Sequence, residues 1–283
     1  MIYLIKRLLA EYNNLFGDIQ KDYFSNNMCN SSNKIWINGL AKSGTSLYEH
    51  IVSELGYVDG ARSILRSRYK CNRYEEGFIC QELFDAFPLS KNTYIKTHAL
   101  YKPEYKYLDL PTKIIVLRDI RDALVSRYFH IISDPKHWDF NRLNHIKNDL
   151  SRFKASVLAI NPTYGISQFE YYARYVNSWI ESPFNTSIFW YEDYISDPIR
   201  EINKIILLLG CGSKDASDIE NKLECKREKL SNMNGSLQSK RKSSIAQSGT
   251  FRSGKIGGHI DFFDSELAFM YQELSSKYKL EMK

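Results

Sequence analysis

A short apolar run, a glycine-rich segment and a helical pattern follow one another near the start of this chain. The run KIWIN occupies residues 34–38 and leads into NGLAKSGTSL, residues 38–47. A strand, a tight glycine loop and a helix in this order direct backbone N–H groups and the positive end of the helix dipole toward one point. We call residues 39–44 the glycine loop. The chain is therefore expected to bind an anion at the end of its first strand.

The glycine loop differs from the loop that binds nucleoside triphosphates. In G-x-x-x-x-G-K-[ST], the lysine follows the second glycine. Gly39 and Gly44 keep that glycine spacing, but Thr45 follows Gly44, and the only lysine of the loop is Lys42. A kinase that uses ATP and magnesium stays an alternative, because Asp119 ends a later predicted strand and is a candidate metal ligand.

Short β-branched and aromatic runs alternate with helical patterns along the rest of the chain. Further strands are expected at residues 93–97, 113–119 and 187–193. The run at 113–119 is apolar without alternation, which is typical of a strand covered on both faces. The pattern predicts an α/β fold with a central parallel sheet flanked by helices. No internal repeat is visible, so residues 1–283 are expected to form a single domain.

Two of the predicted helices have recognisable ends. Asp197 and Pro198 are typical of an N-cap and a first helical position, and Gly210 is typical of a C-terminus. Ser167 and Glu170 form a capping-box pattern at the start of another helix. The apolar stripes of these helices are Ile199, Ile202, Ile205, Ile206 and Leu209 in the first, and Phe169, Tyr172, Val176, Trp179 and Ile180 in the second.

The composition is that of a globular protein. The chain has 283 residues, of which 43% are hydrophobic, and a formal net charge of +6, which suits an anionic ligand. No apolar run approaches the roughly 18–20 residues of a membrane-spanning helix. Residues 1–16 combine helically spaced apolar side chains with charged ones and lack a small-residue cleavage site. We expect an amphipathic helix there and not a signal peptide.

The cysteines predict the redox state of the compartment, and the basic residues bear on which partners the chain binds. The five cysteines are odd in number and contain no C-x-x-C pair, which predicts free thiols in the cytoplasm and neither a disulfide framework nor a zinc site. Lysines cluster between residues 226 and 255, but no nucleic-acid motif accompanies them. Nucleic acid is therefore not an expected partner. A solvated loop and a mobile lid over a small polyanion, at about residues 226–258, are the two interpretations of this stretch.

Residues 132–166 break the alternation of strands and helices. An insertion at this place would lie near the strand ends, where substrates bind in α/β sheets. It is equally a candidate for a segment that covers an acceptor and for a pair of surface helices. His130 and His137 belong to no motif, and structural roles are expected for both.

Five segments in order resemble the motifs of the cytosolic-type sulfotransferases, which use 3′-phosphoadenosine 5′-phosphosulfate (PAPS). AKSGTSL resembles the family's P-K-S-G-T-T-W loop, and Lys96-Thr97-His98 resembles its K-T-H triplet. IIVLRDIRDALVSRYFH, residues 114–130, is similar to the segment in which an arginine and a serine eight residues later hold the 3′-phosphate. The other two are WYEDYISDPIREINKIILLLG, residues 190–210, and FRSGKIGGHIDFF, residues 251–263.

The resemblance implies a P-loop NTPase-like sulfotransferase fold, no required metal and in-line transfer of a sulfuryl group to a hydroxyl or amine. It implies that His98 is the general base, since a histidine of pKa about 6.5 is largely neutral near pH 7. Lys42 would neutralise the leaving phosphate oxygen, so that a fixed cation takes the place of magnesium. Lys96 is expected on the same strand face as His98, within reach of the sulfuryl oxygens.

The donor-binding residues that the resemblance implies lie in four segments. Backbone N–H groups of the loop would assist Lys42, and Arg118 and Ser126 would hold the 3′-phosphate. Tyr191 is at the adenine-contacting place, although a core role is as well supported. The full set is Lys42, Ser43, Gly44, Thr45, Ser46, Arg118, Ser126, Tyr191, Arg252, Ser253 and Gly254.

Several positions depart from the family's pattern. The loop tryptophan that stacks on adenine is Leu47 here, and the lysine after Arg252 is Ser253. The Asp-Trp pair is Gly258-His259, and Ala99 follows the K-T-H triplet where the family often has Leu-Pro. The family's dimerisation segment is absent, so a monomer or a different dimer is expected.

The leading interpretation is a PAPS-dependent sulfotransferase for a small-molecule acceptor, with 3′,5′-adenosine bisphosphate as the product nucleotide. Two alternatives remain at this point. One is the small-molecule kinase described above. The other is a nucleotide-binding module that keeps the fold and lacks transfer, suggested by Leu47, Ser253 and Gly258. The acceptor itself is left open among phenols, sterols, sugars and small polar metabolites.

Overall fold

A computed structural model describes residues 34–60, 92–184, 187–238 and 256–280. The helix expected at residues 1–16 lies outside these residues, as do Arg252, Ser253 and Gly254. No described helix has the length and apolar character needed to cross a membrane.

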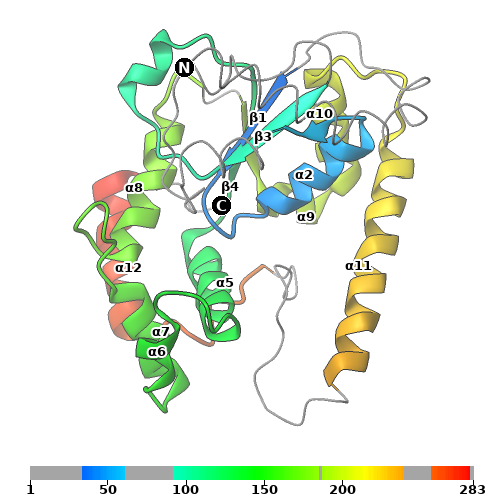
Figure 1. Cartoon of the computed structure of the whole chain (residues 1–283). Helices are drawn as coiled ribbons and strands as arrows, with labels where there is room; N and C mark the ends of the chain where they lie inside the picture. The colour runs from blue at the N-terminus through cyan, green and yellow to red at the C-terminus, as the bar shows by residue number, and fades with distance from the viewer. Residues whose placement is uncertain (1–33, 61–91, 185–186, 239–255, 281–283) are drawn as a thin grey trace, which may run out of the picture.

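Five parallel strands form one sheet in the order β2-β3-β1-β4-β5, and β1 is its middle strand (Figure 1). The expected parallel sheet is therefore confirmed. The two-residue strand β2 was not expected, since two residues carry no periodicity. The strands are β1 Lys34–Gly39, β2 Val58–Asp59, β3 Thr93–Thr97, β4 Thr112–Leu117 and β5 Ile188–Trp190.

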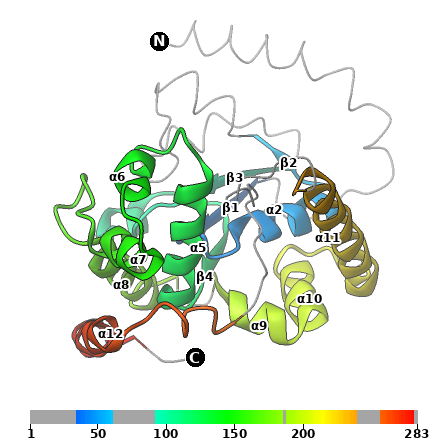
Figure 2. The same ribbon diagram turned by 90° about the horizontal axis from the view of Figure 1, so that it is seen from below.

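Helices cover both faces of the sheet, so the fold is α/β as expected. Figure 2 shows α5, α7, α8 and α12 on one side of the strands and α2, α9, α10 and α11 on the other. A short 3-10 helix, Pro103–Tyr107, precedes β4. The α-helices are α2 Thr45–Glu54, α5 Ile120–Ser133, α6 Phe140–Asn144, α7 Asp149–Leu158, α8 Gln168–Ile180, α9 Tyr191–Ser196, α10 Pro198–Leu208, α11 Ala216–Gln238 and α12 Ser265–Tyr278.

Alternate residues of the strands supply two hydrophobic cores, because successive strand side chains point to opposite faces. On β1, Trp36 belongs to the core shared with α5, α7, α8 and α12, whereas Ile35 and Ile37 belong to the core shared with α2, α10 and α11. On β4, Ile115 and Ile114 divide in the same way. With both faces covered, the carboxyl ends of the strands are the part of the sheet left for a site.

The helices that begin after Ser167 and Asp197 have the N-caps that the sequence predicts. The Asp197 side chain accepts from the N–H of Arg200, and Ser167 accepts from the N–H of Glu170. The reciprocal half of the capping box is not made, since the Glu170 carboxylate accepts from Lys277 and Tyr278 of α12. Most of the α10 stripe is buried, but Ile199, next to the N-cap, is 45% exposed.

The strand expected at residues 187–193 is wrong in its second half. The strand ends at Trp190, and α9 begins at Tyr191. Glu192 and Asp193 lie in the first turn of α9, where acidic side chains interact favourably with the helix dipole. Aromatic residues lie on both sides of this boundary, so the residue pattern of a strand does not show where the strand ends.

Residues 132–166 contain the pair of helices that was one of the two expectations, and the stretch at about 226–258 begins with helix where a loop or lid was expected. Within residues 132–166, α6 and α7 pack on each other and on α5, and α7 also packs on α8. Residues 226–238 continue α11 and are not a loop. Lys226 pairs with Glu54 of α2 at 2.6 Å. Residues 239–255 lie outside the described residues, so a lid remains a proposal.

The expectation of five free thiols is wrong for Cys211. This residue is disulfide-bonded, whereas Cys225 is a free thiol on the exposed surface of α11. Cys29, Cys71 and Cys80 lie outside the described residues, and the argument from five free thiols for a cytoplasmic location does not hold.

Candidate active site

The glycine loop joins β1 to α2 at the carboxyl edge of the sheet, and both of its glycines are required by close contacts. A Cβ on Gly39 would lie 2.6 Å from the Val116 carbonyl oxygen and 2.5 Å from Thr45 Cγ2. Gly44 has a φ of +95°, and a Cβ there would lie 2.5 Å from the ring of Tyr191. The loop is therefore fixed against β4 on one side and against α9 on the other.

Substitution of Gly44 tests this packing. We expect Gly44→Ala to lower the free energy of unfolding by about 2–4 kcal/mol, because the side chain meets both left-handed strain and a ring that cannot move freely. Gly212→Ala is the matched control, since its Cβ would contact nothing within 4 Å. Urea unfolding measures both. Equal effects of the two substitutions would contradict the assigned contact.

The backbone N–H groups at the start of α2 are not all available to a ligand. The Ser43 N–H donates to the Leu40 carbonyl at 3.0 Å, and the Ser43 hydroxyl donates to Val116 O at 3.0 Å. Ser43 therefore shapes the loop from within. The helix itself has no side-chain cap and no acidic residue in its first turn. The first N–H groups of a helix lack intrahelical partners, so those of Thr45 and Ser46 can be offered to an anion, and their role as donors stays a prediction.

Lys42 adopts a backbone conformation that is unfavourable for its residue type. Its φ is 70°, in the left-handed region, and its carbonyl accepts from Arg118 Nη1 at 3.4 Å. A non-glycine residue there costs roughly 1–2 kcal/mol. Strain of this kind concentrates at functional sites.

His98 follows β3 and lies beside the glycine loop. Its Nδ1 is 2.6 Å from the carbonyl oxygen of Gly39. A carbonyl only accepts, so Nδ1 carries the proton and Nε2 has the lone pair. This is the tautomer that a general base needs, with the basic nitrogen directed away from the loop carbonyl.

A hydrogen-bond cluster around Asn38 fixes the backbone on both sides of His98. The Asn38 Oδ1 atom accepts from Thr97 Oγ1 and from the Ala99 N–H, each at 2.7 Å. Its Nδ2 donates to the Ala99 carbonyl at 3.0 Å and to the Tyr175 hydroxyl at 2.8 Å. Asn38 is fully buried. The sequence interpretation missed this residue, because an asparagine at a strand end also reads as a simple turn residue.

The environment of His98 keeps its imidazole neutral. Burial is the largest cause that lowers its pKa to about 4, and the charges of Lys96 and Lys42 lower it further, while the Gly39 carbonyl acts in the opposite direction. Burial likewise lowers the pKa of His130 to about 4, with Lys42 the next cause.

These shifts predict how stability depends on pH. Between about pH 6.5 and pH 4, the unfolded chain binds protons at these two histidines and the folded chain does not. The free energy of unfolding is therefore expected to fall as the pH decreases through this window. Urea unfolding at several pH values measures the slope. His98→Gln combined with His130→Gln should reduce the slope, and an unchanged slope would show that other groups cause it.

Lys96 lies beside α2 in an ion pair. Its Nζ is 2.5 Å from Glu49 Oε2 and 3.4 Å from Ser46 Oγ. The expected proximity to His98 is supported, since the Lys96 charge acts on the His98 pKa. The sequence interpretation did not include Glu49, which holds Lys96 at the first turns of α2.

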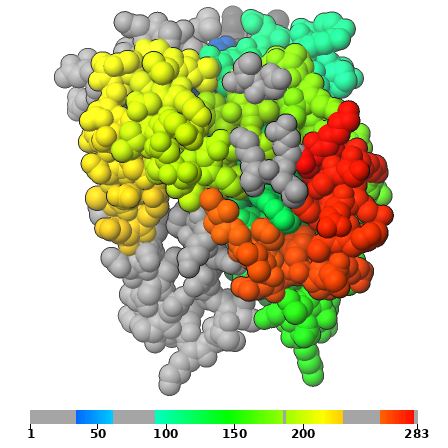
Figure 3. All heavy atoms as spheres, turned by 180° about the vertical axis from the view of Figure 1, so that it is seen from behind, coloured from blue at the N-terminus to red at the C-terminus, as the bar shows by residue number. Residues whose placement is uncertain are grey.

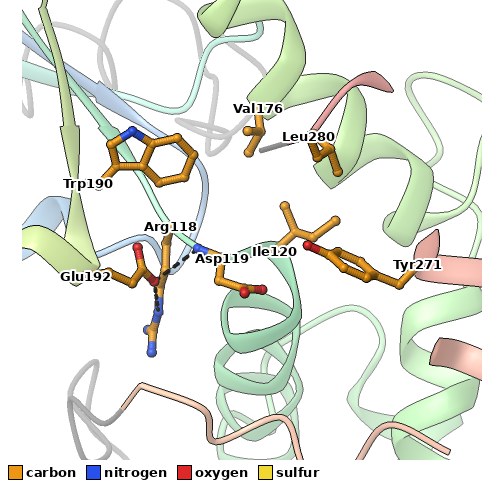
Figure 4. A pocket seen from close by; sticks show the side chains of 8 residues that line it. All are labelled: Arg118, Asp119, Ile120, Val176, Trp190, Glu192, Tyr271 and Leu280. Atoms are coloured by element: carbon orange, nitrogen blue, oxygen red, sulfur yellow. Dashed lines mark hydrogen bonds and ion pairs between the residues drawn. The ribbon is translucent and has the colours of Figure 1, made fainter. Parts of the chain in front are cut away.

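Arg118 lies at the end of β4 between two carboxylates and a ring. Its Nη2 is 3.9 Å from Asp122 Oδ2, and its Nε is 4.0 Å from Glu192 Oε1. The guanidinium carbon is 4.5 Å from the centroid of the Tyr191 ring. Figure 4 shows Arg118 and Glu192 side by side, with Glu192 also bonded to the Asp119 N–H at 3.1 Å. Arg118 is thus buried and oriented next to the glycine loop.

The small cavity drawn in Figure 4 lies behind Arg118. Its volume is about 20 Å³, which holds about one water molecule. It is too small for adenine or for an acceptor. Its lining residues are Arg118, Asp119, Ile120, Val176, Trp190, Glu192, Tyr271 and Leu280.

Asp122, in the first turn of α5, binds the C-terminal segment. Its carboxylate accepts from the N–H groups of Gly257 and His259 at 2.8 and 3.0 Å, and lies 2.9 Å from His259 Nδ1. Figure 3 shows this segment, in orange, beside α5. Ser126 is partly buried on the same helix, one turn after Asp122. Gly257 and His259 thus lie three and five residues after Gly254, which is outside the described residues.

Tyr191 is 4% exposed and contacts Gly44 and Arg118. The burial supports the core role, and the two neighbours are residues that the resemblance assigns to donor binding. Any direct contact with adenine stays a prediction.

His130 and His137, for which structural roles were expected, lie near each other, and His130, whose pKa burial lowers, is close enough to Lys42 for that charge to lower it further. The ring centroids of His130 and His137 are 6.2 Å apart, and His137 stacks on Trp138 at 5.5 Å. The charge of Lys42 acts on His130. Both residues, at the end of α5 and in the following loop, are candidates for the acceptor side.

Asp119 is the candidate metal ligand of the kinase alternative, but its carboxylate makes its contacts within the chain, with Arg121. Its carboxylate caps α5 through the Arg121 N–H at 2.8 Å and pairs with the Arg121 guanidinium. Among the described residues, no group of three or more His, Cys, Asp or Glu side chains is arranged to hold a metal ion.

Comparisons with known proteins give one family and several solved structures of similar fold. The family described as Sulfotransferase domain matches residues 32–281. A search of curated proteins finds no match. Similar solved structures include mouse sulfotransferase SULT7A1 complexed with PAP, with 17% identity, a TM-score of 0.58, and coverage of 88% of this chain and 86% of that chain.

Retinol dehydratase provides two further similar structures. Its complex with retinol and PAP has 17% identity, a TM-score of 0.54, and coverage of 91% of this chain and 85% of that chain. Its complex with androsterone and inactive cofactor PAP has 18% identity, a TM-score of 0.52 and coverage of 91% and 83%. These likenesses show a shared fold, and the family match extends over nearly the whole sequence. The chain therefore belongs to the sulfotransferase domain family.

Proposed function

We propose that this protein transfers a sulfuryl group from PAPS to a hydroxyl or amine of a small-molecule acceptor, with His98 as the general base. The observation that carries the proposal is the convergence of Lys42, the first N–H groups of α2 and the His98 imidazole at the end of β1. Family membership supports the reaction class, and the similar structures that are complexes with PAP support the donor.

The proposed reaction follows from the charges of the site. His98 Nε2 accepts the acceptor's proton while the acceptor oxygen or nitrogen bonds to sulfur. The bond between sulfur and the bridging phosphate oxygen breaks, and the electron pair stays on the phosphate of the leaving bisphosphate. Lys42 and the N–H groups of Thr45 and Ser46 stabilise that charge. Lys96 offers its ammonium to the sulfuryl oxygens.

The 3′-phosphate is assigned to Arg118 and Ser126. Arg118 is buried, and its contacts with Glu192 and Tyr191 orient its guanidinium. A planar guanidinium held in one orientation is well suited to bind phosphate oxygens. We propose that Arg252, Ser253 and Gly254 close over this phosphate, since the segment that follows them is fastened to Asp122. We also propose that residues 1–283 form a single domain. Within it, residues 132–166 are proposed to cover the acceptor.

A thermal-shift comparison tests the donor class. The ligands are 3′,5′-adenosine bisphosphate without metal, and ADP with magnesium. Ligand at about 100 times its dissociation constant adds roughly 2.7 kcal/mol, or on the order of 5 °C in melting temperature for a chain of this size. We expect a shift with the bisphosphate alone. A shift with ADP and magnesium alone would favour a kinase, and no shift with either would favour a nucleotide-binding module without this donor.

A further inference from the structure

The ion pair between Glu49 and Lys96 connects the anion-binding helix to the strand that carries the proposed base. Lys96 lies on β3, two residues before His98, and Glu49 lies in the second turn of α2. The Nζ–Oε2 distance is 2.5 Å, and the side chains are 25% and 18% exposed. Both charges are thus partly withdrawn from water, where an ion pair is stronger than on an open surface.

Glu49 is an unexpected residue type at this place. A carboxylate in the second turn of a helix that receives an anion opposes the anion's charge. Its pairing with Lys96 offsets that repulsion. The Lys96 ammonium has three donors, and within the part of the chain that the structure describes two of them are used, in contacts with Glu49 and Ser46 Oγ. The third proton is left for a group that enters beside Ser46.

Lysine needs such a partner more than arginine would. Its ammonium is a point charge on a flexible four-carbon stem, and fixing that stem costs up to about 2 kcal/mol of rotamer entropy. A carboxylate that already holds the ammonium beside the first turn of α2 removes part of this cost before a ligand binds.

We propose that Glu49 is a positioning residue that holds the Lys96 ammonium beside Ser46, where it contacts the sulfuryl group of the donor. The inference rests on the proposed function, because it assigns the end of the site next to Ser46 to the sulfuryl group. It adds a residue that acts through Lys96 and does not itself touch the donor.

The test compares two nucleotides that differ at the sulfuryl end. PAPS and 3′,5′-adenosine bisphosphate share the adenosine and the 3′-phosphate, and only PAPS carries the sulfuryl group. The ratio of their dissociation constants, bisphosphate over PAPS, measures contacts to that group, and effects on the shared part cancel. Calorimetric titration without acceptor gives both constants.

We expect Glu49→Ala and Lys96→Met each to lower this ratio about 5- to 10-fold. The two substitutions together should lower it no further than Lys96→Met alone, because Glu49 acts through Lys96. Glu49→Gln, which keeps an oxygen acceptor, should retain most of the ratio. Glu54→Ala is the matched control, since it removes the 2.6 Å pair with Lys226 at the far end of α2 and should leave the ratio unchanged.

The outcomes separate the two proposals. A ratio that Glu49→Ala leaves unchanged, or losses that add in the double variant, would overturn the role of Glu49 while leaving the donor assignment intact. Absence of binding of either nucleotide to the unsubstituted protein would overturn the proposed donor and, with it, this inference. Circular dichroism and melting temperature establish that each variant is folded.

Discussion

His98→Ala is expected to lower the rate of sulfuryl transfer by about 10²–10⁴-fold, the usual contribution of a positioned general base. The dissociation constant of 3′,5′-adenosine bisphosphate should stay within about twofold, because the imidazole lies on the acceptor side of the glycine loop. The measurement is transfer from radiolabelled PAPS to the best acceptor found among phenols, sterols, sugars and polar metabolites, together with titration of the bisphosphate.

His145→Ala is the control for this substitution. Its ring Nδ1 also contacts a backbone carbonyl, that of Asn141 at 2.5 Å. Unlike His98, however, His145 is exposed to solvent, at the C-terminal end of α6. Its loss should leave the transfer rate at saturating acceptor unchanged, because the exposed ring is not expected to take part in the proton transfer, and a contact with the acceptor would change only the acceptor's binding. Undiminished turnover in His98→Ala would remove His98 as the base, and a loss of bisphosphate binding equal to the loss of rate would assign it to donor binding.

Lys42→Gly is expected to separate activity from stability. Glycine relieves the left-handed strain of roughly 1–2 kcal/mol and adds about 0.5–1 kcal/mol of backbone entropy cost. The free energy of unfolding should therefore change little, with a net gain between about 0 and about 1.5 kcal/mol. Transfer should fall about 10²–10³-fold, as for loss of one preorganised charge-stabilising group.

A second lysine in the same backbone region supplies the control. Lys279, which ends α12, has a φ of 47°. Lys279→Gly should have a similar small effect on urea unfolding and none on transfer. If Lys42→Gly retained transfer, the strained lysine would be a structural residue of the loop. A large loss of stability would show that the side chain holds the loop together.

Local patterns predicted much of the fold. The apolar runs located β1, β3 and β4, and Asp197 and Ser167 marked helix starts that the structure confirms. These features depend on side-chain periodicity and on caps within a few residues. The boundary between β5 and α9 was wrong, because aromatic residues suit both a strand and a buried helix turn.

The residues that orient the site could not be predicted from local sequence patterns. Asn38 and Ala99 meet across 61 positions, and Asp122 binds His259 across 137. Glu49 meets Lys96 only because α2 folds back against β3. Sequence spacing carries no information on such pairs, since they depend on how whole elements pack.

The sequence by itself predicted an anion site from the glycine loop, and through the resemblance of its five motifs it predicted the reaction class and the roles of Lys42, Arg118 and His98. Only the tertiary structure decided how these groups are oriented. It directed the His98 Nδ1–H toward the Gly39 carbonyl oxygen, which accepts from it, committed the Ser43 N–H to the Leu40 carbonyl, and enclosed Arg118 between Asp122 and Glu192. The physical reason is that hydrogen-bond direction and burial are properties of packed elements, whereas the chemical capacity of a side chain is fixed by its identity.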